Sequence, residues 1–284
     1  MVSVTAIETH QGITEAPDVV DVDRELQAWI EPRVSVVIPT INEADNLRQI
    51  LPRIPADHEV VVVDGGSTDD TLEAARALRP DVRIVHQQRS GKGDALITGW
   101  RAATGDIVVT LDADGSALPE EIPVFVSALV GGADYAKGSR YLEGGGSTDL
   151  TWLRSTGNTA LSKTVNLLFG TQYTDLCYGY NAFWRRVGET LAGDADGFEI
   201  ETLMNIRAAQ AGLRIVEVPS VEVDRIHGES NLRPFRDGMR IARLIARERW
   251  HGRRRDRGDG REGETRGHKG RPPGFESASR SIVA

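Results

Sequence analysis

The sequence lacks several features that would place it in a definite class at once. It has a single cysteine, Cys177, among 284 residues, which excludes an internal disulfide framework and any zinc site built from several cysteines. We therefore expect a reducing, cytoplasmic setting. No run of about 18 apolar residues is present, so we expect no membrane-spanning helix. Residues 1–10 have neither the basic stretch nor the apolar core of a signal peptide.

The overall charge is moderate, but its distribution along the chain is uneven. A net charge of −8 and a pI of about 5.4 give no sign of nucleic-acid binding. Residues 1–31 carry seven acids and one base, whereas residues 233–257 carry ten bases and three acids. We predict an acidic, mobile leader at 1–31, a folded domain at 32–235, a basic helix at 236–255 and a disordered tail at 256–284.

Short β-branched runs alternate with helical patterns through the folded domain. The runs lie at 34–38, 59–63, 82–85 and 106–111, and the helical patterns at 46–54, 71–78 and 93–104. Alternation of this kind builds an α/β fold with a mostly parallel central sheet flanked by helices. Ligands of such sheets bind at the carboxyl ends of the strands, so the residues that follow each strand are the candidates for a site.

Three of these strands end in polar or acidic segments, at 39–43, 64–69 and 112–116. Asp112 and Asp114 can share a divalent cation, because magnesium takes only one or two protein carboxylates and leaves positions for phosphate oxygens. An isolated Asp-x-Asp is more often a pair of solvated loop acids. The two other polar strand ends favour a metal site here.

Other nucleotide and phosphate enzymes share parts of this pattern. The segment 89–94 lacks the spacing of a Walker loop and the third glycine of a dinucleotide fingerprint. It either offers its amides and Lys92 to an anion or is an ordinary glycine-rich start of a helix. Residues 109–116 also resemble the nucleophile motif of haloacid-dehalogenase-type phosphatases. That family places the motif on its first strand, whereas three strands precede it here.

Seven segments resemble, in the same order, the inverting glycosyltransferases of family 2, and most closely their dolichol-phosphate mannose synthase branch. They are 36–43, 61–69, 91–93, 111–114, 138–141, 175–179 and 225–230. The resemblance covers about 34–235 and implies the GT-A fold. Each segment alone is a weak indication of the family, but seven segments in the family's order are a highly specific one.

The resemblance implies roles for individual residues. Those implied to bind the nucleotide sugar are Pro39, Asn42, Glu43, Asp64, Lys92, Asp112 and Arg140. Asp112 and Asp114 would hold Mg²⁺ or Mn²⁺. Arg225 would act as a catalytic residue by bringing positive charge to the pyrophosphate.

The chain departs from the family pattern in two places. Gly65 stands where the family often has a second aspartate after the second strand, which removes one expected nucleotide contact. Gly115 and Ser116 stand where many members have leucine and glutamine after the metal motif. We still expect Ser116 to lie near the cation.

The implied reaction moves a hexose from a nucleotide-diphosphate sugar, of the GDP-mannose or UDP-glucose type, to a polyprenyl (dolichyl-type) phosphate with inversion. A lipid phosphate is already ionised near neutral pH, so a strong general base is needed only for a hydroxyl acceptor. The candidate bases are Asp175, Glu199 and Glu201, of which we favour Asp175 as a catalytic residue. The alternatives are a soluble glycosyltransferase with a small-molecule or protein hydroxyl acceptor and a sugar-nucleotide binder without turnover.

The basic helix suggests a partner surface. Arginines recur three or four residues apart, at Arg236, Arg240, Arg243 and Arg247. This pattern suits a helix lying on an anionic membrane, and it equally suits a helix packed on the domain with a solvated arginine face. The stretch 161–169 is either interfacial or core. We predict peripheral contact with the inner face of the membrane through 236–255, and no nucleic-acid partner.

Overall fold

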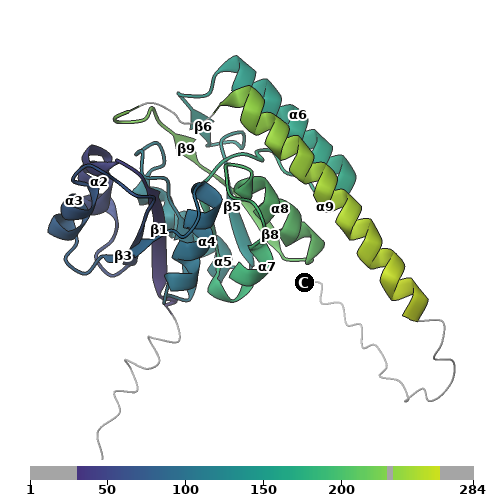
Figure 1. Ribbon diagram of the computed structural model, residues 1–284, viewed down its shortest axis with the longest axis horizontal. Helices are drawn as coiled ribbons and strands as arrows, with labels where there is room; N and C mark the ends of the chain where they lie inside the picture. Colours follow the sequence, from purple (N-terminus) through teal and green to yellow (C-terminus); the bar gives the residue numbers. More distant parts are fainter. Residues whose placement is uncertain (1–30, 229–232, 263–284) are drawn as a thin grey trace, which may run out of the picture.

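The computed structural model describes residues 31–228 and 233–262 (Figure 1). The predicted acidic leader, apart from its last residue, and the part of the predicted tail after residue 262 lie outside the described residues. The predicted domain, apart from residues 229–232, and the whole of the predicted basic helix lie within them.

A seven-stranded sheet forms the centre of the domain, in the order β3-β2-β1-β4-β7-β5-β8. Its strands are β1 (Val34–Thr40), β2 (Glu59–Asp64), β3 (Arg83–His86), β4 (Ile107–Thr110), β5 (Tyr135–Ser139), β7 (Asn181–Trp184) and β8 (Ile215–Pro219). Only β7 is antiparallel to its neighbours β4 and β5 among these strands, and the other pairs are parallel. The predicted mostly parallel sheet is therefore confirmed.

Helices cover both faces of the sheet (Figure 1). They are α2 (Ala44–Ile50), α3 (Thr71–Leu78), α4 (Lys92–Ala102), α5 (Ile122–Val130), α6 (Trp152–Phe169), α7 (Gly188–Leu191), α8 (Ile200–Gln210) and α9 (Pro234–Glu262). Alternate residues of β1 point to opposite faces, so Ile38 packs with α2 and α5 while Val37 packs with α4 and α8. Burial on both faces explains why the strands are almost continuously apolar.

Short elements complete the fold. A two-stranded sheet pairs β6 (Gly146–Ser147) with β9 (Val221–Glu222). Three 3₁₀ turns lie at Leu51–Arg53, Pro119–Glu121 and Arg185–Val187. The first of them ends the helical pattern that the sequence places at 46–54, because Pro52 has no amide hydrogen to continue an α-helix.

The C-terminal helix α9 is longer than the predicted 236–255, since its backbone is helical from Pro234 to Glu262. It lies beside α6 and contacts α8 (Figure 1). Its apolar residues Ile241, Leu244 and Ile245 are buried, and each is at most 5% exposed. The helix is therefore packed on the domain, and the stretch 161–169 forms the second half of its neighbour α6. Among the described residues, no helix combines the length and hydropathy needed to cross a membrane.

The close approach of α4 to the sheet requires Gly99. A Cβ atom at this position would lie 2.3 Å from Val37 Cγ1 and 2.7 Å from Val63 Cγ2. We expect Gly99→Ala to lower the free energy of unfolding by about 1–3 kcal/mol, because added volume in a packed core forces neighbouring atoms apart. Urea denaturation checks this.

The matched control is Gly157→Ala in α6, where an added Cβ would meet nothing within 4 Å. That change should raise the free energy of unfolding by about 0.4–1 kcal/mol, because alanine restricts the unfolded chain. Equal stability of the two variants would contradict the packing argument.

Candidate functional site

A cavity of about 600 Å³ lies where the carboxyl ends of β1, β2 and β4 meet, as expected from the polar strand ends. Seven of the predicted site residues line it, namely Pro39, Glu43, Lys92, Asp112, Asp114, Arg140 and Arg225. Asn42, Asp64 and Asp175 do not line it. The structure thus brings together most of the residues that the sequence singled out, from five separate segments of the chain.

Asn42 and Asp64 shape the loops at the edge of the cavity. Asp64 accepts hydrogen bonds from the amides of Gly66 (3.1 Å) and Ser67 (3.0 Å). Burial raises the pKa of Asp64, but these hydrogen bonds outweigh it and hold the pKa below the usual aspartate value. Asn42 accepts a hydrogen bond of 2.8 Å from the Thr68 amide and so ties the β1 loop to the β2 loop. Both side chains hold together the loops that follow β1 and β2, and Ile41 and Gly65 of these loops line the cavity.

Lys92 is the centre of an ion cluster in the wall of the cavity. Its Nζ lies 2.7 Å from Asp112 Oδ1 and 2.7 Å from Glu201 Oε1. Burial lowers the pKa of Lys92, but the two carboxylates outweigh it and raise the pKa above the usual lysine value, so the cation persists. The sequence offered Lys92 as an anion-binding group. The structure instead pairs it with two carboxylates.

Arg225 holds the second aspartate of the pair. Its Nη2 lies 2.8 Å from Asp114 Oδ2 and its Nη1 lies 3.4 Å from Glu43 Oε1. Gly115 has a φ of 77°, and a Cβ there would come within 2.4 Å of Ile226 Cδ1. The glycine that departs from the family pattern therefore lets the segment around Arg225 lie directly on the metal motif.

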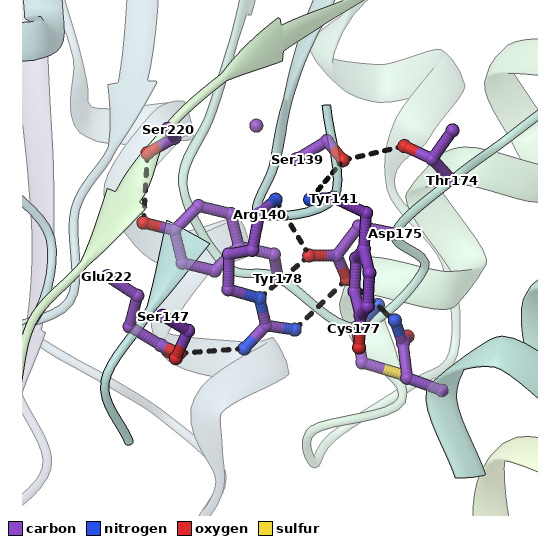
Figure 2. Close-up of polar contacts among 12 residues, drawn as sticks. Ser139, Arg140, Tyr141, Ser147, Thr174, Asp175, Cys177, Tyr178, Ser220 and Glu222 are labelled. Atoms are coloured by element: carbon purple, nitrogen blue, oxygen red, sulfur yellow. Dashed lines mark hydrogen bonds and ion pairs between the residues drawn. The ribbon is translucent and has the colours of Figure 1, made fainter. Parts of the chain in front are cut away.

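Arg140 lies in a third ion cluster, with Asp175 and Glu222 (Figure 2). Its Nε and Nη2 donate to the two oxygens of Asp175 at 2.7 and 3.0 Å, and its Nη1 donates to Glu222 at 3.0 Å. The guanidinium stacks on the Tyr178 ring, 4.8 Å from its centroid. These contacts hold the arginine in one orientation at the wall of the cavity.

Asp175 lies behind Arg140 and is fully buried. Besides the arginine, Asn158 donates to its Oδ1 at 3.1 Å. Burial raises the pKa of Asp175, but the hydrogen bonds and charge of Arg140, with Lys137 nearby, outweigh it and keep the pKa below the usual value. Asp175 does not line the cavity, and its contacts place it to orient Arg140. This geometry does not favour the predicted role as a base.

The other two candidate bases are placed differently. Glu201 lines the cavity but is bound to Lys92. Glu199 is 9% exposed, does not line the cavity and lies 3.9 Å from the Arg240 guanidinium. The single thiol, Cys177, does line the cavity, and burial raises its pKa to about 12, so it stays protonated at neutral pH.

The cavity has an apolar part that sequence reasoning missed. It lies between α6 and α9 and is lined by Leu150, Leu153, Leu161, Phe235 and Ile241. Residues 153, 157 and 161 are four apart, so they share one face of α6. That spacing could have revealed an apolar face but not its partner, because α9 comes about 80 residues later. The sequence carried no signal for Glu222, a lone acid on a short strand.

The donor set suits a divalent cation shared with a diphosphate. Asp112 and Asp114 supply hard oxygen ligands, and the Ser116 amide and hydroxyl bond Asp114 Oδ1 at 3.0 and 2.8 Å, which fixes that carboxylate. The described residues contain no group of three His, Cys, Asp or Glu side chains placed to hold a metal alone. Two carboxylates are what a magnesium or manganese ion takes when phosphate oxygens complete its coordination.

Comparison with known proteins agrees with this site. A family model described as glycosyl transferase family 2 matches residues 35–191. The chain is 36% identical over 246 residues to a polyprenol monophosphomannose synthase of Mycolicibacterium smegmatis, covering 79% of this chain and 87% of the relative. It is 34% identical over 217 residues to a dolichol-phosphate mannosyltransferase of Pyrococcus furiosus, covering 71% of this chain and 59% of the relative.

A solved structure shares the fold over most of the chain. It is glucosyl-3-phosphoglycerate synthase from Mycobacterium tuberculosis in complex with Mn²⁺, UDP-glucose and phosphoglyceric acid, with a TM-score of 0.59 and 25% identity. The alignment covers 83% of this chain and 86% of that one.

The Arg140–Asp175 pair predicts a defined pH dependence of stability. We expect Asp175→Asn to lower the free energy of unfolding at neutral pH by about 3–5 kcal/mol, because it removes one partner of a buried ion pair. The folded-state pKa of Asp175 lies below its unfolded value. The ion pair therefore stabilises the fold fully above the unfolded pKa of about 3.9, and this stability is lost as the pH falls further.

Urea denaturation between pH 3 and pH 8 measures the difference between the native protein and Asp175→Asn. The difference should be constant above about pH 5 and shrink below about pH 4. A difference that shrank between pH 5 and pH 8 instead would contradict the lowered pKa.

Proposed function

The chain belongs to glycosyl transferase family 2 and has the GT-A fold, and on that premise we propose that it is an inverting hexosyltransferase with a polyprenyl phosphate acceptor. The donor in this proposal is a nucleotide-diphosphate sugar of the GDP-mannose or UDP-glucose type. Names of two relatives support the acceptor, since one is a polyprenol monophosphomannose synthase and the other a dolichol-phosphate mannosyltransferase.

The observation that carries the proposal is the continuity of the cavity. One space of about 600 Å³ joins the ion clusters at the strand ends to the apolar part between α6 and α9. An acceptor with a phosphate head and an isoprenoid tail has the same division. Its phosphate would lie near Arg140, with Arg154 also in the wall, and its first isoprene units would lie against Leu153 and Phe235.

The chain's own residues provide most of the required charge. In the proposed mechanism, Asp112 and Asp114 would hold Mg²⁺ or Mn²⁺, which would supply a Lewis acid to stabilise the departing diphosphate. Arg225 leaves its contacts with Asp114 and Glu43 and donates to the diphosphate, adding fixed positive charge where negative charge develops. Arg140, oriented by Asp175, holds the acceptor phosphate in line with the anomeric carbon.

A phosphate acceptor also fits the positions of the candidate bases, since neither Asp175 nor Glu201 is free to accept a proton. Asp175 is buried behind Arg140, and Glu201 is bound to Lys92. An ionised phosphate oxygen attacks without losing a proton, whereas a hydroxyl would need a base to accept its proton. The proposed acceptor therefore matches what these carboxylates are able to do.

The surface around the apolar part of the cavity supports peripheral contact with a membrane. Phe235, which lines the cavity, is 84% exposed, and Trp152, the first residue of α6, is 81% exposed. On α9, Arg240 and Arg247 are near the domain's own acids, whereas Arg236 and Arg243 are exposed. We place the membrane-facing charge on those exposed arginines, because the opposite side of α9 is packed on the domain.

The transferase proposal predicts metal-dependent glycolipid formation. We expect nucleoside diphosphate release from GDP-mannose or UDP-glucose only with Mg²⁺ or Mn²⁺ and polyprenyl phosphate, with glycolipid as the second product. Asp114→Asn should lower kcat by about a hundredfold or more, since a catalytic metal contributes several kcal/mol to the transition state. Asp45→Asn, at an exposed acid paired with Arg48, is the control and should leave kcat unchanged.

Two outcomes of this assay would overturn parts of the proposal. Transfer to phosphoglyceric acid or another soluble acceptor, without glycolipid, would favour the soluble alternative. Binding of nucleotide sugar without any turnover would indicate a binding protein.

The membrane proposal predicts a charge-dependent association. We expect the double change Arg236→Gln, Arg243→Gln to weaken binding to phosphatidylserine vesicles by about 1 kcal/mol per arginine and to leave binding to neutral vesicles unchanged. Vesicle co-sedimentation measures both. Arg76→Gln on α3, an exposed arginine far from α9 in the fold, is the control. Equal weakening by the control would argue against a localised membrane face.

A further inference from the structure

The Lys92 ammonium occupies the space between Asp112 and Glu201. It contacts both oxygens of Asp112, at 2.7 and 2.9 Å, and one oxygen of Glu201 at 2.7 Å. The Phe198 ring lies 5.8 Å from the nitrogen, and Gly179 leaves room that a Cβ would close, at 2.8 Å from Nζ. The lysine is therefore enclosed on several sides, and its side chain is only 14% exposed.

Two glycines fix the position of this lysine. A Cβ at Gly91 would lie 2.1 Å from Asp196 O, and a Cβ at Gly93 would lie 1.8 Å from Ala195 O. The Gly93 amide also donates to Asp196 O at 2.8 Å. The start of α4 is thus pressed against the segment that leads into α8, the helix that carries Glu201. The Gly-Lys-Gly sequence serves this contact and the placement of Lys92.

The two aspartates of the metal motif consequently have different partners. Asp114 is bound by Arg225, which comes from a segment without regular secondary structure and is 22% exposed. Asp112 is bound by Lys92 at the first residue of α4, and Lys92 is anchored in turn by Glu201, which is 3% exposed. Arg225 can exchange Asp114 for another anion without moving a helix, whereas Lys92 is held beside Asp112 by its second ion pair, with Glu201.

We propose that Lys92, anchored by Glu201, is a built-in counter-cation of Asp112 that competes with the divalent cation for that carboxylate. Asp114 is then the carboxylate left for the metal, and Lys92 limits how tightly the metal binds before the nucleotide sugar arrives. This inference rests on the metal-dependent function proposed above. It adds a residue that sets metal affinity by occupying one of the two carboxylates.

The physical basis is the charge around Nζ. Asp112 and Glu201 reach the same nitrogen, so removing its charge would leave two adjacent carboxylates with no cation between them. Like charges at short range repel, and the Glu201 side chain is only 3% exposed while that of Asp112 is 31% exposed, so a cation that takes the vacated place is favoured. In the binding experiment described next, Mn²⁺ is the cation that can take this place.

The test is Mn²⁺ binding to the full chain without nucleotide, measured by calorimetry and by the loss of the free Mn²⁺ electron paramagnetic resonance signal. Lys92→Met should bind Mn²⁺ about tenfold or more tightly than the native protein, the effect of removing a unit positive charge at contact distance. The matched control is Lys163→Met, at an exposed lysine of α6 outside the cavity, which should not change the affinity.

A double change separates competition at Asp112 from a general effect of charge. If Lys92 competes at that carboxylate, the gain from Lys92→Met should disappear when Asp112→Asn is added. A gain that persisted in the double variant, or no gain in the single variant, would overturn the proposal. Should Lys92→Met fail to fold, Glu201→Gln still tests it: Lys92 is then left to Asp112 alone, and Mn²⁺ binding should become weaker, so unchanged or tighter binding would overturn the proposal.

These outcomes are distinguishable from failure of the transferase proposal. The Mn²⁺ measurement needs neither donor nor acceptor, whereas the transferase proposal fails on the absence of glycolipid with every donor. A protein that makes glycolipid but shows no gain in Mn²⁺ affinity on Lys92→Met would refute the role of Lys92 alone.

Discussion

Charge compensation at the carboxyl edge of the sheet is the constraint on which the arrangement of this domain depends. A carboxylate buried without a partner costs several kcal/mol, and the buried acids Glu201 and Asp175 are each held by a cation from another element. Lys92 from α4 holds Asp112 after β4 and Glu201 on α8, and Arg140 after β5 holds Asp175. Because each cluster joins elements far apart in the sequence, the same contacts also set how the helices lie around the sheet.

The clusters divide the cavity into parts with different chemistry. Near the strand ends, carboxylates and arginines provide a place for a diphosphate and a divalent cation, and between α6 and α9 the walls are apolar. Family membership alone does not distinguish a lipid phosphate from a soluble acceptor, since a structural relative is a glucosyl-3-phosphoglycerate synthase. The apolar walls contributed by Leu153 and Phe235 are the local feature that favours a lipid.

Much of the site could be predicted from the sequence, because parallel strands place their carboxyl ends at one edge. That reasoning found the polar strand ends, and most of the residues singled out in the sequence line the cavity. It could not give the direction of side chains that depends on distant partners. Asn42 and Asp64 support loops beside the cavity, and Asp175 is turned toward Arg140. The partners of Lys92 had no signal in local spacing, and the spacing of the apolar face of α6 did not reveal that α9 packs opposite it.

The sequence by itself determined the fold class, the family and the edge of the sheet at which chemistry occurs, because these follow from local periodicity and from short motifs in a set order. Only the tertiary structure decided which carboxylates are free and which are bound. Arg225 and Glu43 meet across 182 residues of chain, and Arg140 and Asp175 across 35. Such pairings arise when separate elements pack and must compensate buried charge, and no spacing along the chain records them.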